Sequence, residues 1–165
     1  MKKLLTFIAI TSIVTAAKAQ TNWITYKVDN HISLKFPKQP VTLKPGTIGV
    51  MDADSVKYGI STIDLSKAAN IDSATLATMK ENPEFIDQMR TSMQQTGKVT
   101  IEPFKLSTWH GLTSYTSSGV GLDNKKLNML LIIYGATIYD IFTISPPNTN
   151  TKNGELFLNS ATFTN

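Results

Sequence analysis

Two neighbouring side chains with ligand-binding chemistry, Trp109 and His110, precede a glycine in a stretch that is typical of a turn. An indole beside an imidazole on a loop is a common means of holding a ligand. The same residue types also fit a structural role, with Trp109 at the rim of the core and His110 exposed. Trp109 and His110 are therefore candidate binding residues, and both interpretations stay open.

A third candidate, Asp140, is a carboxylate inside an apolar stretch that runs from residue 127 to residue 144. Gly135-Ala136 is the Gly-X pair of a type II′ hairpin turn, and a tight turn there places Asp140 opposite Leu131 on a mostly apolar face. An unpaired carboxylate in such a place is costly, and burial shifts its pKa upward. A lysine or backbone partner, or a locally open face, explains this residue more simply than a catalytic acid does.

Other chemical motifs are sparse in the sequence. It holds no phosphate-binding glycine loop, no Gly-x-Ser-x-Gly and no His-Glu-x-x-His. Asp52-Ala53-Asp54 begins like a calcium loop, but the residues that follow do not continue the pattern, so we expect a polar loop. The other histidine, His31, is expected to be a solvated turn residue. We therefore predict no catalytic residue, no metal and no cofactor.

The elements that must position these side chains are mostly strands. Alternating polarity and β-forming composition predict strands at 23–28, 32–36, 41–43, 47–51, 56–63, 99–106, 112–120 and along both arms of 127–144, with a short strand ending at Phe163. Pro103 places its strand at an edge or a bend, and Gly59 marks a bulge or a close backbone approach. Capping residues predict helices at 74–80 and from Asn82-Pro83-Glu84 to Gly97, and 155–158 fits one or two helical turns.

Both faces of the 127–144 hairpin are mostly apolar. A sheet that is wetted on one side alternates apolar and polar residues, so each face of this hairpin must be covered by another layer. The sequence therefore predicts an α+β protein with a sandwiched antiparallel sheet.

The order of elements resembles that of the PsbP-like superfamily. The stretches that carry the resemblance are WITYKVDNHISLKFP near the start and GELFLNSATF near the end, so it extends from Trp23 to Phe163. It implies an antiparallel β-sheet with helices on both faces, an α/β/α sandwich. It carries over no site residue, because members of this superfamily share no active-site motif and bind different partners.

The N-terminus predicts export. Lys2 and Lys3 precede an apolar run and an Ala-Lys-Ala sequence, which is the pattern of a signal peptide over residues 1–19 with cleavage near Ala19. The apolar run is shorter than the roughly 20 residues that span a bilayer, so we expect no stable membrane insertion after cleavage. Residues 20–165 are then one α+β domain in the periplasm or outside a bacterial cell.

The composition of this domain narrows its partners. Loss of three lysines with the signal peptide leaves 13 basic against 12 acidic residues, a net charge of +1, which gives no footprint for nucleic acid. The sequence has no cysteine, which excludes disulfides and thiol chemistry. We expect an exported, non-enzymatic binding or accessory domain whose partner is an envelope protein or a small molecule. The alternatives are a small-molecule or lipid carrier, and a hydrolase that uses His110 and Asp140.

Overall fold

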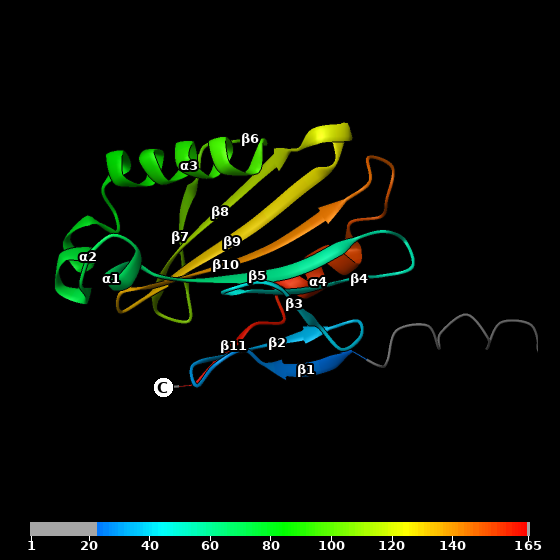
Figure 1. Cartoon of the computed structure of the whole chain (residues 1–165), viewed down its shortest axis with the longest axis horizontal. Coiled ribbons are helices and arrows are strands. Elements are labelled where there is room, and N and C mark those ends of the chain that lie inside the picture. Colours follow the sequence, from blue (N-terminus) through cyan, green and yellow to red (C-terminus); the bar gives the residue numbers. More distant parts are fainter. Residues whose placement is uncertain (1–22, 165) are drawn as a thin grey trace, which may run out of the picture.

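The computed structural model describes residues 23–164 of the chain, so the predicted signal peptide, residues 1–19, lies outside the described residues. Two antiparallel sheets and four α-helices make up the described part (Figure 1). Within that part, no helix combines the length and the apolar character needed to cross a membrane.

A sheet of eight strands lies at the centre of the fold. Its order is β3-β4-β5-β10-β9-β8-β6, and β7 also pairs with β8. The strands are β3 (Val41–Lys44), β4 (Thr47–Met51), β5 (Lys57–Asp64), β6 (Thr100–Ile101), β7 (Lys105–Trp109), β8 (Leu112–Val120), β9 (Lys126–Tyr134) and β10 (Thr137–Ser145). Every pairing is antiparallel, which confirms the predicted large antiparallel sheet.

The predicted hairpin is formed by β9 and β10, two adjacent strands at the middle of this sheet. Its register is the expected one, with Leu131 opposite Asp140 and Ile133 opposite Ile138. Gly135 has a φ of +57° at the first central position of the turn, as a type II′ turn requires. Glycine adopts this conformation without steric cost, so the local sequence fixes the register of the hairpin.

The structure shows where Pro103 and Gly59 lie in the large sheet. Glu102, Pro103 and Phe104 separate β6 from β7, and both strands pair with β8, so Pro103 lies at the sheet edge as expected. Gly59 lies opposite Phe142 in a regular register, without a bulge. A Cβ atom at Gly59 would lie 2.5 Å from Cζ of Phe142, so the close approach is made by an aromatic ring and not by backbone.

Helices α2 (Ser73–Met79) and α3 (Pro83–Gly97) cover one face of the large sheet, after the short α1 (Leu65–Ala68). The predicted N-caps are present, since Asp72 accepts the N–H of Thr75 at 2.7 Å and Asn82 accepts that of Glu84 at 2.8 Å. The helices pack their buried side chains against apolar residues of β8, β9 and β10. This cluster is made of Leu76, Ile86, Ile101, Tyr115, Leu127, Met129, Leu131, Ile133 and Ile138.

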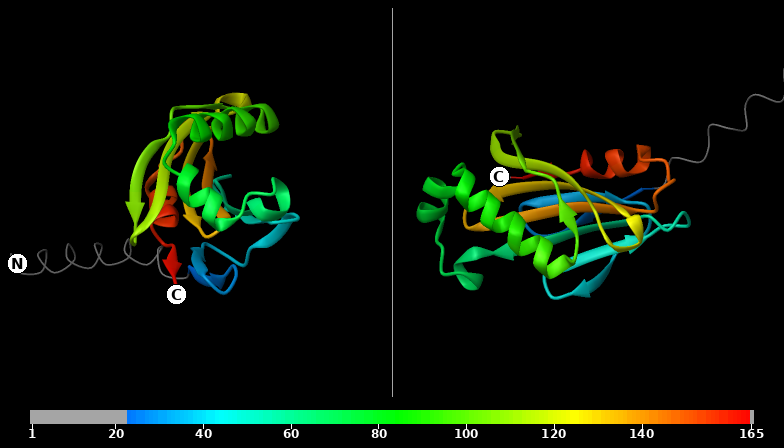
Figure 2. Two further views of the ribbon diagram at one scale, coloured as in Figure 1. Left: turned by 90° about the vertical axis from the view of Figure 1, so that its left-hand side faces the viewer. Right: turned by 90° about the horizontal axis from the view of Figure 1, so that it is seen from above.

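The other face is covered mainly by a second sheet, and here the structure differs from the predicted α/β/α sandwich. The order of this sheet is β1 (Ile24–Lys27), β2 (Ile32–Phe36) and β11 (Thr162–Phe163), and one short helix, α4 (Lys152–Leu158), lies beside it. Figures 1 and 2 show the small sheet and α3 on opposite sides of the large sheet. The apolar side chains of β2 and Phe157 of α4 fill the space between the layers, which is why one helix suffices on this face.

A partly buried hydrogen bond joins β10 to the β1–β2 turn of the small sheet. The hydroxyl of Tyr139 on β10 donates to Oδ2 of Asp29 at 2.8 Å, and Oδ1 of Asp29 accepts the N–H groups of His31 and Ile32. Partial burial raises the pKa of Asp29, but these hydrogen bonds outweigh burial and hold the pKa below its ordinary value. His31 is not the solvated residue that we expected, because its ring packs against Tyr134 and Phe163 at centroid distances of 4.8 and 5.9 Å.

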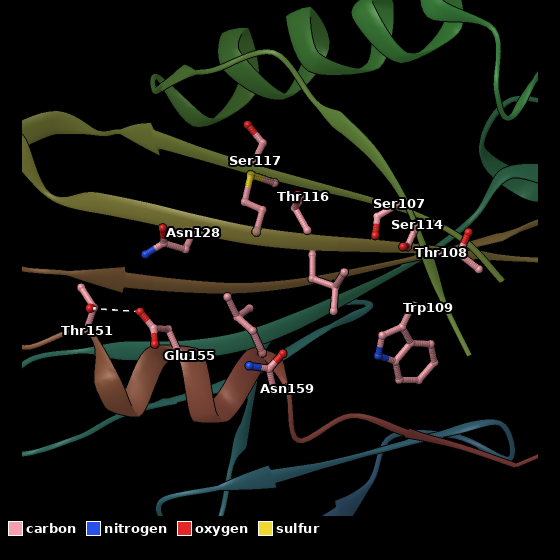
Figure 3. Close-up of a pocket in the computed structure, with 13 residues that line it drawn as sticks. Ser107, Thr108, Trp109, Ser114, Thr116, Ser117, Asn128, Thr151, Glu155 and Asn159 are labelled. Carbon is pink, nitrogen blue, oxygen red and sulfur yellow. Dashed lines mark hydrogen bonds between the residues drawn. The ribbon is translucent and has the colours of Figure 1, made fainter. Parts of the chain in front are cut away.

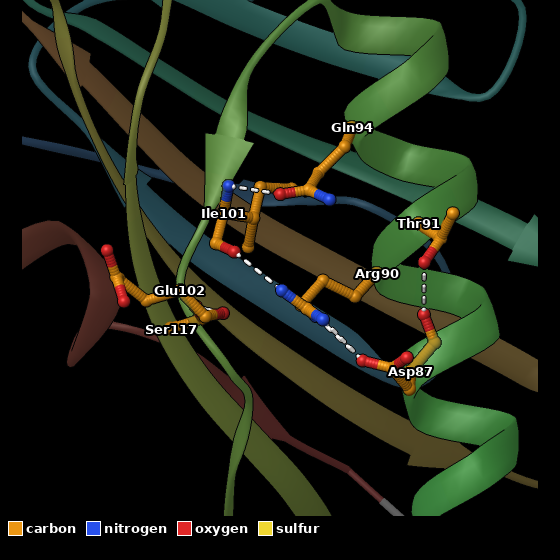
Figure 4. Close-up of polar contacts among 7 residues, drawn as sticks. All are labelled: Asp87, Arg90, Thr91, Gln94, Ile101, Glu102 and Ser117. Carbon is orange, nitrogen blue, oxygen red and sulfur yellow. Dashed lines mark hydrogen bonds and ion pairs between the residues drawn. The ribbon is translucent and has the colours of Figure 1, made fainter.

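Polar side chains of α3 hold the helix to the edge of the large sheet (Figure 4). The amide oxygen of Gln94 accepts the N–H of Ile101 at 2.8 Å, and Nη1 of Arg90 donates to the carbonyl oxygen of Ile101 at 3.2 Å. Arg90 is held in turn by Asp87, one helical turn earlier. The N–H and the carbonyl oxygen of Ile101, which face away from β8, therefore both have hydrogen-bond partners. These bonds fix α3 along β6.

We expect Tyr139→Phe to lower the free energy of unfolding by about 1 kcal/mol, because it leaves a half-buried carboxylate oxygen of Asp29 without its donor. Urea denaturation at pH 7 measures this change. Tyr26→Phe is the matched control, since Tyr26 is half-buried in β1 and packs on Phe36. Equal stability of the two variants would contradict a role for this bond in joining the sheets.

Candidate functional site

The Trp109–His110 stretch forms the turn between β7 and β8. Trp109 pairs with Leu112, and the two residues between them, His110 and Gly111, have φ of +48° and +80°. Positive φ at both central positions is the requirement of a type I′ hairpin turn. Trp109 lies half-buried at the rim of the core and packs against His110 and Phe163, with ring centroids 4.5 and 6.3 Å away, while His110 is exposed.

A polar groove of about 550 Å³ opens beside Trp109, between the β7–β8 hairpin and α4 (Figure 3). Hydroxyl and amide side chains dominate its lining, which includes Ser107, Ser114, Thr116, Asn128, Thr151 and Asn159. The Oγ atom of Ser114 is buried and has no hydrogen-bond partner among the described residues. His110 does not line this groove, so the structure places a pocket beside Trp109 alone.

Asp140 lies on the opposite face of the large sheet, which α3 covers. Its neighbours across the strands are Ser61 of β5 and Leu131 of β9, and Thr47 of β4 lies opposite Ser61. The hydroxyl oxygens of Thr47 and Ser61 are 2.9 Å apart and share a hydrogen bond. Thr47, Ser61 and Asp140 therefore form a polar row across three neighbouring strands.

A cavity of about 530 Å³ lies over this polar row, between the sheet, the C-terminal part of α3 and the β3–β4 turn. Its walls are largely apolar and include Met93, Val99, Phe142 and Ile144, each of which is half-buried. Of the fifteen residues of α3, Ile86 alone is buried. The helix thus covers this part of the sheet incompletely and leaves a space with an apolar wall and a polar floor.

The electrostatics of the cavity centre on Asp140, which is 8% exposed. Burial raises the pKa of its carboxyl to about 7, and the positive charge of Lys44 opposes this shift. No ion pair joins Lys44 to Asp140 in the described part of the chain, and Oδ1 of Asp140 is buried there without a hydrogen-bond partner. Asp140 therefore lines the cavity with a carboxyl group whose buried Oδ1 has no donor among the described residues.

The structure does not bring the three candidate residues together. Trp109 packs with the cluster on the small-sheet face, whereas Asp140 faces the cavity beneath α3, which His110 does not line. The hydrolase hypothesis needs His110 and Asp140 in one site, and this geometry gives it no support.

A metal site is not favoured either. Among residues 23–164, no cluster of three or more His, Cys, Asp or Glu side chains is placed to hold a metal ion. The calcium-like stretch is a polar loop in which Asp52 accepts the N–H groups of Asp54 and Val56 and the hydroxyl of Tyr58. Its oxygens are thus used to shape the loop.

Sequence reasoning did not single out Lys44, Thr47 and Ser61, which share the cavity with Asp140. Hydroxyl and lysine side chains are common on exposed strands, so nothing in their types marks them as members of a site. The register of β4, β5 and β10 is what brings them together, and that register depends on long-range pairing. Once β10 is known to pair with β5, the register places Asp140 opposite Ser61 and the polar row can be recognised.

We expect Asp140→Asn to remove a pH dependence of stability. Between about pH 4, the ordinary pKa of an unfolded aspartate, and about pH 7, the folded protein keeps a proton that the unfolded chain releases. The free energy of unfolding of the natural protein therefore falls as the pH rises through this window. At pH 8 relative to pH 4.5, Asp140→Asn gains on the order of 3 kcal/mol over the natural protein, as measured by urea denaturation. Asp54→Asn, a change at an exposed residue, should show no such gain. If the difference in the free energy of unfolding between Asp140→Asn and the natural protein does not change with pH, the raised pKa of Asp140 is refuted.

Comparison with known proteins identifies the fold. No protein-family model matches the chain, and no curated protein matches its sequence. The structure is similar to the solution structure of cyanobacterial PsbP (CyanoP) from Synechocystis sp. PCC 6803, with a TM-score of 0.59 and 10% identity over 86% of this chain and 92% of that one. A crystal structure from Bacteroides thetaiotaomicron VPI-5482 matches with a TM-score of 0.45 and 11% identity, over 81% of this chain and 45% of that one. The chain has the PsbP-like fold, an α+β architecture with a large antiparallel sheet and few helices.

Proposed function

We propose that this protein is an exported, non-enzymatic binding domain that holds a small molecule in the cavity beneath α3. The observation that carries the proposal is the buried Oδ1 atom of Asp140, which lacks a partner among the described residues and belongs to a residue that lines a cavity of about 530 Å³. Small-molecule sites typically measure about 300–1,000 Å³ and combine apolar walls with a few polar groups.

The apolar walls support a ligand with an apolar body. Met93 and Val99 on one side, and Phe142 and Ile144 on the other, keep part of their surface uncovered in the cavity. Covering apolar surface contributes about 25 cal/mol per Å², so a ligand that fills the space gains binding energy from these four side chains. This supports the carrier hypothesis over the broader accessory role.

The polar floor supports binding in preference to catalysis. The hydroxyls of Thr47 and Ser61 bond to each other and not to a base, so neither is activated as a nucleophile. No histidine lines the cavity, and the two histidines of the sequence, His31 and His110, lie elsewhere. The groups on the floor can fix the orientation of a ligand.

Export belongs to the same proposal. The signal peptide predicted for residues 1–19 would deliver the domain to the periplasm or the exterior of a bacterial cell. A carrier of this kind would meet its ligand there, either free in solution or presented by an envelope protein.

We expect an uncharged apolar probe, 1-octanol, to bind in the cavity. With ¹³C-labelled methionine methyl groups, octanol should shift Met93, which lines the cavity and not the groove, and leave Met51 on β4 unchanged. Val99→Trp should weaken binding at least tenfold, because a wall residue then fills the space. The signal of Met93 reports this loss.

The matched control for this experiment is Val120→Trp, at a valine of β8 that is 47% exposed and lies outside the cavity. It should bind octanol like the natural protein. The indole N–H of Trp109 reports on the groove of the opposite face. A shift of that signal without a shift of Met93 would move the binding site to the groove and overturn the proposal, because Met93 lines the cavity and not the groove.

A further inference from the structure

The charge around the cavity is distributed unevenly. Among the described residues that line it, Lys44 and Asp140 are the two that carry charge. Lys44 is exposed on the β3–β4 hairpin, whereas Asp140 is buried at the floor. A ligand that enters therefore meets a cation at the rim and a carboxyl group at the far end.

The floor offers hydrogen-bond acceptors in a row. A carboxylate accepts hydrogen bonds and donates none, and Oδ1 of Asp140 has no donor among residues 23–164. Ser61 lies directly opposite Asp140 in the register, and Thr47 directly opposite Ser61. Their two hydroxyl oxygens share one hydrogen bond, so each keeps lone pairs for a further donor.

A primary ammonium group matches this row. It carries three N–H donors and one positive charge, so it can satisfy the carboxylate and reach the neighbouring hydroxyl oxygens together. A hydroxyl group supplies one donor and no charge. A second carboxylate would be repelled by Asp140 and would have to remain near Lys44.

We propose that the cavity binds a primary alkylammonium ligand, with its ammonium on Asp140 and its alkyl chain along Met93, Phe142 and Ile144. This inference rests on the proposed small-molecule function and adds the chemical class of the head group. The alkyl chain covers the half-buried apolar walls, and the ammonium supplies the donors that the polar row lacks.

The pH dependence of binding follows from the groups that face Asp140. From the β3–β4 hairpin the charged group is Lys44, and α3 contributes Ser92, Met93 and Thr96, which do not titrate. Burial raises the pKa of Asp140 to about 7, and an alkylamine stays protonated to about pH 10, as a lysine does. Binding of the amine should therefore strengthen by on the order of tenfold between pH 5.5 and pH 8, as the carboxyl loses its proton.

The test compares three probes of one chain length: octylamine, 1-octanol and octanoate. Titrations of the natural protein at pH 8, followed by the methyl signal of Met93, should give octylamine at least tenfold tighter than octanol, and octanoate weakest. Octanol binding should not change between pH 5.5 and pH 8. The wild-type pH series needs no variant, so it tests the proposal even if substitutions at Asp140 impair folding.

Two variants test whether the preference for octylamine depends on the charges of Asp140 and Lys44. Asp140→Asn should keep octanol binding and reduce the preference for octylamine to about threefold or less, because the ion pair is lost. Lys44→Gln should strengthen octylamine binding, since it removes the opposing charge at the rim. Asp123→Asn, an exposed change in the β8–β9 connection, should leave all three affinities unchanged.

Three results would overturn the inference. Equal binding of octylamine and octanol at pH 8 would refute it, and so would a preference for octylamine that survives in Asp140→Asn. In both cases the small-molecule function stands, because the probes still bind in the cavity. If none of the three probes shifts Met93, the inference and the proposed function fail together.

Discussion

The burial of both faces of the β9–β10 hairpin is the constraint on which the rest of the structure depends. Leu131 and Ile133 project to one side of β9, and Leu130 and Ile132 project to the other, and all four are buried. Neither face could be left in water without exposing a row of large aliphatic side chains. Each face is therefore covered by a different kind of layer, helices on one face and a small sheet with α4 on the other.

The two covers are attached in different ways, and the cavity lies beneath the helical cover. The small sheet is joined to β10 by the bond between Tyr139 and Asp29, and its apolar side chains fill the space beneath it. Helix α3 is fixed at the sheet edge, where Gln94 and Arg90 bind Ile101. The cavity extends from Ile101, at this attachment, across the sheet to Asp140, Ser61 and Thr47.

The features that could be predicted from the sequence are those that depend on local chemistry. The Gly135-Ala136 turn set the register that places Asp140 opposite Leu131, and capping residues identified the starts of α2 and α3. The position of Asp140 in an apolar face followed from that register, and so did the direction of its pKa shift. Each of these depends on residues near one another in the chain.

The features that could not be predicted depend on pairings between distant segments. Nothing in the alternating pattern of β2 says whether it joins the large sheet or pairs with β1 and β11, because both choices bury the same side chains. For the same reason, the sequence does not place Lys44, Thr47 and Ser61 beside Asp140. The short α1 was also missed, since its four residues are held chiefly by the capping carboxylate of Asp64.

Gly59 does not line the cavity, but its contact with Phe142 determines the shape of the cavity. The ring of Phe142 belongs to the cavity wall and rests where any side chain at position 59 would stand. Even a methyl group there would force the ring away from β5. Residue 59 thus acts as a spacer whose size determines the position of the wall. A substitution at position 59 on β5 would therefore change the space inside the cavity, while the residues that line the cavity keep their types.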